Sequence, residues 1–71
     1  MDDNDKLKAM LYHWLDHNGE HADTYVKWAE KPSVAAVDGL AGLLNEIAAE
    51  TNKISGLFKK AINVLESAGK P

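Results

Sequence analysis

The chain of 71 residues has no cysteine and no arginine. Without cysteine, neither disulfide bonds nor thiolate metal sites can form. Without arginine, and with a formal net charge of −3, the chain lacks the basic groups that dominate nucleic-acid recognition. Chains this short bury a limited core, so a metal ion or a partner chain is the remaining source of added stability.

Long hydrophobic runs are also absent from the sequence. No apolar run approaches the roughly 20 residues that a membrane-spanning helix needs, and no signal peptide is visible. We therefore expect a single helical domain over residues 1–71, located in the cytoplasm, with neither a membrane nor a nucleic acid as its partner.

Apolar residues in the first half recur with helical spacing, so we expect one helix over about residues 5–30. Asn18 and Gly19 interrupt the apolar content but not its phase, and a break there is the alternative, because glycine commonly follows a helix end. Lys31-Pro32-Ser33 is the clearest boundary, since proline disfavours helix for the residue before it.

A second apolar stripe predicts a long helix over about residues 33–68, ended by Gly69 and Pro71. The alternative is a break within residues 51–56, which are poor in helix formers. The fold expected is all-α, an antiparallel hairpin whose second helix overhangs the first at residues 59–65. Such a hairpin would pair into a four-helix bundle, whereas the break would give a three-helix bundle.

The expected core follows from the two stripes. It consists of Leu7, Leu11, Trp14, Leu15, Ala22, Tyr25, Val26, Leu40, Leu44, Ile47, Ile54, Phe58, Ile62 and Leu65. Exposure of Leu44 or Ile47 in a single chain would contradict this core. Asn18 falls within the first stripe, where a buried asparagine commonly fixes register or oligomeric state. Trp28 lies at the edge of that stripe and suits either the core or an interface.

The chemically unusual feature is a ladder of three histidines, His13, His17 and His21. Residues four apart lie above one another on a helix. A turn near residue 31 would place His17 near Glu46 and His13 near Glu50. Imidazoles beside carboxylates suit either a site for a divalent transition metal such as zinc, nickel, cobalt or iron, or plain ion pairing in solvent. The candidate metal ligands are thus His13, His17, His21, Glu46 and Glu50.

The segment from His13 to Ala29 carries the pattern HWxxHNxEHAxxYxxWA. In this pattern the chain resembles a family of small helical bacterial and archaeal proteins of uncharacterised function, in which a long alanine- and leucine-rich helix follows. The resemblance implies a helical hairpin and marks the histidine segment as a hallmark, and it implies no activity. Gly19 departs from the helix-favouring residue of the pattern.

Two functions from different classes fit the sequence. The first is a non-enzymatic interaction module that associates with itself, as a homodimer, or with a larger protein through its apolar stripes. The alternative is a small metal-binding protein that uses the histidine ladder. We expect no enzyme, because a hairpin of this size offers little concave pocket, and no serine has a histidine nearby in the expected hairpin.

Overall fold

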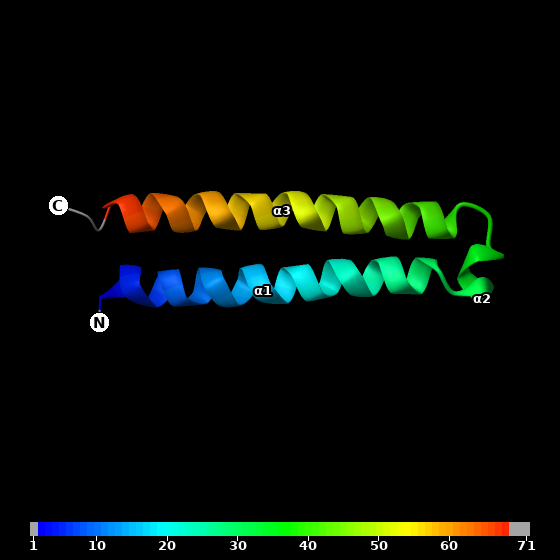
Figure 1. The fold of residues 1–71 in the computed structure, drawn as a ribbon, viewed down its shortest axis with the longest axis horizontal. Helices are drawn as coiled ribbons and strands as arrows, with labels where there is room; N and C mark the ends of the chain where they lie inside the picture. Colours follow the sequence, from blue (N-terminus) through cyan, green and yellow to red (C-terminus); the bar gives the residue numbers. More distant parts are fainter. Residues whose placement is uncertain (1, 69–71) are drawn as a thin grey trace.

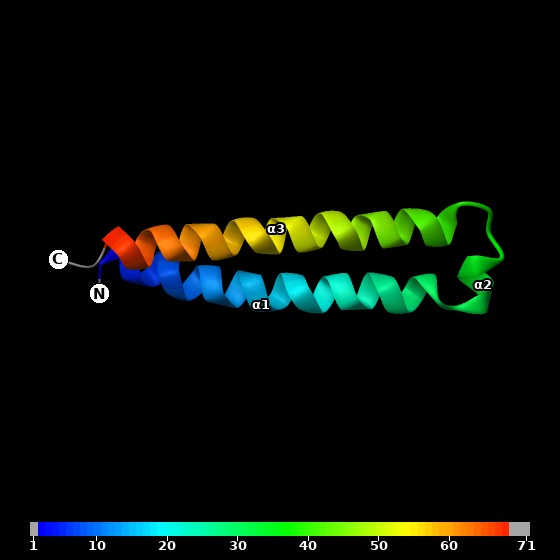
Figure 2. The ribbon, with the colours of Figure 1, turned by 45° about the horizontal axis from the view of Figure 1, so that its top comes forward.

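The computed structural model describes residues 2–68, which form an antiparallel helical hairpin (Figure 1). Helix α1 spans Asp3–Ala29, the short helix α2 spans Pro32–Ala35, and α3 spans Leu40–Ala68. The two long helices lie side by side along the whole hairpin in both ribbon views (Figures 1 and 2). Helix is the only regular secondary structure within residues 2–68, which confirms the predicted all-α hairpin.

Helix α1 begins with a side-chain cap. The Asp2 carboxylate accepts a hydrogen bond from the Asp5 backbone N–H at 2.9 Å, and Asp3 and Asp5 place negative charge at the positive end of the helix dipole. The helix then continues through Gly19 to Ala29. The alternative break at Asn18-Gly19 is therefore wrong, and the unbroken apolar phase was the better guide.

The connection between the long helices is longer than expected. Lys31 is extended, as residues before proline usually are, and Pro32 starts the four-residue α2. Gly39 then has a φ of 78°, a left-handed conformation that glycine adopts without strain. The predicted start of the second helix near residue 33 is wrong, because α2 and this turn use up the residues before Leu40.

The late start of α3 makes the two long helices nearly equal, with 27 and 29 residues. The predicted overhang is therefore wrong: Ile62 is only 4% exposed, and the Lys8 Nζ lies 3.5 Å from a Glu66 carboxylate oxygen. Helix α3 also continues without interruption through residues 51–56, so the three-helix alternative is wrong. The predicted helix end at Gly69 and Pro71 lies outside the described residues.

The hairpin is closed by one stripe on each long helix, with the alternating three- and four-residue spacing of a coiled coil. All members of this inner stripe are buried or half-buried. In α1 they are Lys8, Leu11, Leu15, Asn18, Ala22, Tyr25 and Ala29, and in α3 they are Ala41, Leu44, Ala48, Thr51, Ser55, Phe58, Ile62 and Leu65. Several are alanines, which lets the helix backbones approach closely.

Candidate functional site, an apolar face with two histidines

Several residues predicted for the core are exposed. Ile47 is 47% and Ile54 46% exposed, and the exposed fractions of Leu7, Trp14 and Val26 lie between 38% and 42%. Exposure of Ile47 contradicts the core expected for a single chain, although the fold itself is as predicted. The physical reason is width: the apolar stripe of each helix is broader than one partner helix can cover.

Of these exposed residues, Leu7, Trp14, Ile47 and Ile54 belong to a second stripe on each helix, whereas Val26 lies on the opposite side. Each member directly precedes a residue of the inner stripe, so the second stripe is turned by about 100° around the helix. We call these the outer stripes. They consist of Leu7, Met10, Trp14, His17, His21, Thr24 and Trp28 in α1, and of Leu40, Leu43, Ile47, Glu50, Ile54, Leu57, Ala61 and Val64 in α3.

The two outer stripes lie on the same side of the hairpin. Both are displaced from the inner stripe in the same rotational sense about their own helix, and because the helices are antiparallel, this displacement leads to one shared side. That side is here called the apolar face. Its α3 half includes Leu43 and Leu57, which are 57% and 61% exposed, and Val64, which is 68% exposed.

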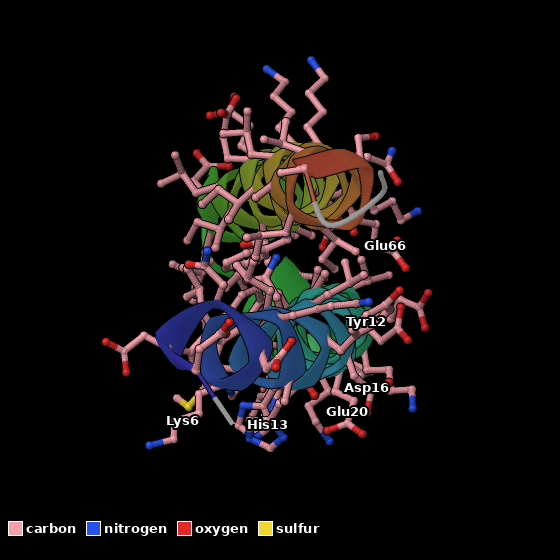
Figure 3. The ribbon with its side chains drawn as sticks, turned by 90° about the vertical axis from the view of Figure 1, so that its left-hand side faces the viewer. Lys6, Tyr12, His13, Asp16, Glu20 and Glu66 are labelled. Carbon is pink, nitrogen blue, oxygen red and sulfur yellow. The ribbon has the colours of Figure 1, made fainter. Side chains whose placement is uncertain are left out.

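The opposite side, here called the polar face, is formed by the residues that directly follow the inner stripe. Figure 3 looks along the hairpin and shows Tyr12, Asp16 and Glu66 on this same side, from both long helices. The α3 half of the polar face also carries Asn52 and Lys59. The large exposed aliphatic residues of α3 are therefore gathered on the apolar face.

The register of the two helices is fixed by contacts near the middle. The Asn18 side-chain amide donates to the Thr51 carbonyl at 2.6 Å and to the Ser55 hydroxyl at 2.9 Å. One turn away, the Trp14 and Phe58 rings pack with centroids 6.4 Å apart. Asn18 thus lies within the inner stripe, as predicted, and its amide is used in a contact between the helices.

The three histidines form the predicted ladder. The ring centroids of His13 and His17 are 5.6 Å apart, and those of His17 and His21 are 4.8 Å apart in an edge-on arrangement. His21 also stacks on Tyr25 at 6.2 Å. His17 and His21 belong to the apolar face, whereas His13 projects from α1 away from α3 (Figure 3).

The glutamates lie elsewhere than predicted. The expected pairs of His17 with Glu46 and of His13 with Glu50 are wrong, because the long connection shifts the register by about two helical turns and brings Ser55 to Asn18. Glu46 lies on the side of α3 that faces away from α1. Glu50 lies in the outer stripe, near the level of His21, and accepts a hydrogen bond from Lys53 at 2.9 Å.

The five candidate metal ligands are accordingly not brought together. Among residues 2–68, no group of three or more His, Cys, Asp or Glu side chains is placed to hold a metal ion. The His17–His21 pair remains the closest approach of two potential ligands in the ladder. Metal binding at these residues therefore remains a prediction, and it would need ligands from solvent or from a partner.

Two features that the sequence did not indicate lie at the ends of the hairpin. A polar hollow at the open end is lined by Asp2, Asp5, Lys8, Leu65 and Glu66, among others. At the closed end, the Lys31 ammonium lies 4.8 Å from the centre of the Trp28 ring, a cation–π contact that anchors the edge of the apolar face. In the part of the chain that the structure describes, no helix has the length and apolar character needed to cross a bilayer.

Comparisons with known proteins identify a family but no activity. No curated protein and no solved structure matches the chain. A family model matches residues 7–65, which include both long helices except for their outermost ends and both histidines of the apolar face. The chain belongs to this family, which is described as a domain of unknown function, DUF8180.

Proposed function

We propose that the chain is a non-enzymatic self-association module, in which the apolar face of one hairpin packs against that of a second copy to form a four-helix bundle. The observation that supports this is the pair of outer stripes on one side of the hairpin. Their three- and four-residue spacing is that of a helix-packing stripe, and the fold of one chain leaves it uncovered. Large exposed apolar side chains gathered on one side of a protein mark interaction sites.

The sequence predicted self-association because the two helices were expected to differ in length. In the structure, the two long helices are nearly equal in length. The apolar face gives self-association stronger support, because burial of each large aliphatic side chain contributes roughly 1.5–3 kcal/mol. A second hairpin offers the same length and the same spacing of side chains, and two copies in contact form the closed symmetric dimer most common among oligomers.

Ile54, at the centre of the α3 outer stripe, gives the most direct test. Size-exclusion chromatography with light scattering should show a dimer for the unchanged chain at micromolar concentration, and a monomer for Ile54→Lys. The matched control is Asn52→Lys, which introduces the same charge on the polar face and should leave the dimer intact. Circular dichroism establishes that both variants remain helical.

A monomeric unchanged chain at about 100 µM would refute self-association and leave a larger protein as the partner of the apolar face. Loss of the dimer in Asn52→Lys as well as in Ile54→Lys would show that the interface is not confined to the apolar face. Persistence of the dimer in Ile54→Lys would show that the interface lies elsewhere.

A second candidate function is binding of a divalent transition metal at His17 and His21. It is favoured by their spacing of four residues and by the 4.8 Å between their ring centroids. Calorimetry with Zn²⁺ and Ni²⁺ should show binding that is lost in His17→Ala. His13→Ala is the matched control, because His13 projects from the outward side of α1. No heat of binding, or equal affinity in His17→Ala, would reject this candidate.

A further inference from the structure

The apolar faces of two hairpins can meet in two symmetric ways, and this inference rests on the self-association proposed above. If the two-fold axis runs parallel to the helices, α1 of each copy lies on α3 of the other. If the axis runs across the hairpin, α1 lies on the partner's α1 and α3 on the partner's α3. Every contact between neighbouring helices is antiparallel in both arrangements, so helix direction alone does not choose between them.

In the first arrangement, each residue keeps its level, which is its position along the long axis of the hairpin. An axis parallel to the helices moves no residue along them, so an α1 residue meets the α3 residue that lies at its own level in the single chain. Trp14 and Phe58 share a level, and Asn18 lies between Thr51 and Ser55. The outer stripes then bring large apolar residues together: Leu7 meets the partner's Val64, Trp14 meets the partner's Leu57, and Trp28 meets the partner's Leu43.

The same levels bring the charged residues of the outer stripes together. Glu50 is the one acidic residue in these stripes, and the cation-forming residues are His17 and His21. Because Thr51 lies within one turn of His21, the His21 imidazole meets the partner's Glu50 carboxylate. An imidazole and a carboxylate can share a hydrogen bond in either protonation state of the histidine, and the two-fold axis makes this pair twice.

The second arrangement separates these groups. If the axis crosses the hairpin near its middle, reversal of α1 places Trp14 against the partner's His21, and reversal of α3 places Glu50 against the partner's Leu57. At any other level of the axis, α3 still lies on an outer stripe that carries no cation-forming residue. The Glu50 carboxylate would then keep only its hydrogen bond from Lys53 of its own chain and lose water to an aliphatic side chain, which is less favourable than a contact with a partner imidazole. Charge complementarity therefore separates two arrangements that apolar burial alone does not.

We propose that the second copy binds with its α3 on α1 of the first, so that His21 pairs with the partner's Glu50. The absence of native cysteine permits a clean cross-linking test. Leu7→Cys and Val64→Cys chains are mixed in equal amounts and oxidised with copper phenanthroline, and the disulfide-linked heterodimer is measured by mass spectrometry. The matched control mixes Leu43→Cys with Val64→Cys.

The expected result is rapid heterodimer formation in the first mixture and at least about tenfold slower formation in the control, because a disulfide needs Cα atoms closer than about 7 Å. Faster cross-linking of the control would assign the other arrangement. Sedimentation of the same mixtures before oxidation separates the two failures: monomers refute self-association itself, whereas dimers that cross-link in the control pair, or in neither pair, overturn only this arrangement.

The paired charges give an independent test. Glu50→Lys should weaken the dimer by at least about tenfold, since close charge pairs across interfaces couple by this much or more. His21→Glu in the same chain should restore it, by making the pair again with reversed charge. Glu46→Lys is the control, on the outward side of α3. Failure of the double variant to recover affinity would overturn the pairing of His21 with the partner's Glu50.

Discussion

The apolar face and the polar face of the hairpin are built on the same two helices, one residue to either side of the same inner stripe. On α3, the apolar face presents Ile47, Ile54 and Leu57, whereas the polar face presents Asn52 and Lys59 at comparable heights. The helical backbone is the same on both sides, so the hairpin fold does not require this difference in side chains. A side that stays in water has no need of large aliphatic residues, and their concentration on one side of α3 supports the proposal that a partner covers this side.

The inner stripe differs from the outer stripes in the size and polarity of its side chains. At its centre lie Asn18, Thr51 and Ser55, and its α1 half also contains two alanines. The outer stripes, by contrast, carry two tryptophans and several leucines and isoleucines. The contact within one chain thus has polar and small side chains at its centre, and only five residues of the described chain are buried. A single hairpin is accordingly expected to be marginally stable.

The largest effect is expected from two charges on the apolar face. Ile47→Lys with Leu57→Lys removes four large side chains from the interface of a dimer, at roughly 1.5 kcal/mol or more each. The dissociation constant should rise by at least about a thousandfold, and the melting temperature should stop depending on concentration. Asn45→Lys with Asn63→Lys adds the same charge to the polar face, and analytical ultracentrifugation should find its dimer unchanged. Equal effects of the two double variants would remove the distinction between the faces.

A smaller loss is expected from the inner stripe. Ile62 is 4% exposed, and Ile62→Ala should lower the free energy of unfolding by about 2–5 kcal/mol. Val64→Ala, two residues away on the apolar face, is the control. In a monomeric variant that carries Ile54→Lys, Val64→Ala should change stability by no more than about 0.5 kcal/mol. Urea denaturation followed by circular dichroism measures both, and similar losses would show that the two stripes are not distinct.

The sequence was sufficient for the all-α hairpin, both long helices and the presence of Asn18 in the stripe between them. It was not sufficient for the register. Pro32 marked a boundary correctly, but nothing in the residues around it distinguished a tight turn from a connection that ends at Gly39. That difference displaced every predicted contact between the helices by about two turns, including those of Glu46 and Glu50 with the histidines.

The periodicity of the sequence also could not show which part of the apolar stripe would stay exposed. A stripe as broad as that from Leu7 to Trp28 is compatible with one wide core or with two adjacent seams. The two are distinguished only by how close the partner helix lies and how far it reaches around. The alanines of the inner stripe bring α3 close to α1 but leave Trp14 and Ile47 uncovered, and this follows from packing in three dimensions.

A gain of stability is expected from replacement of Asn18, the polar residue at the centre of the α1 inner stripe. Asn18→Leu replaces an amide between the helices by an apolar side chain and should raise the free energy of unfolding by about 1 kcal/mol, because a polar residue in a helix seam costs stability while it fixes register. Thermal denaturation measures the gain. Nuclear magnetic resonance spectra should show broadened or doubled signals if the register is relaxed, and a destabilised variant with a single set of signals would contradict this role of Asn18.

The smallest effect is expected at Gly19, which lies beside the inner stripe on the polar side. Beyond its chain neighbours and the backbone of its own helical turns, an added Cβ there would meet no atom within 4 Å, so Gly19→Ala should stabilise the hairpin by about 0.5–1 kcal/mol through helix propensity alone. Gly39→Ala is the contrasting control and should destabilise, because its φ of 78° strains any other residue. Thermal denaturation of both variants compares them, and a loss of stability in Gly19→Ala would reveal a close neighbour on the polar face.

Coverage of the apolar face by a second copy is measured by sedimentation equilibrium of the unchanged chain. Over a series from about 1 to 100 µM, the molar mass should rise to twice the 7.8 kDa of the single chain and stay there. A molar mass of one chain throughout the series would refute self-association.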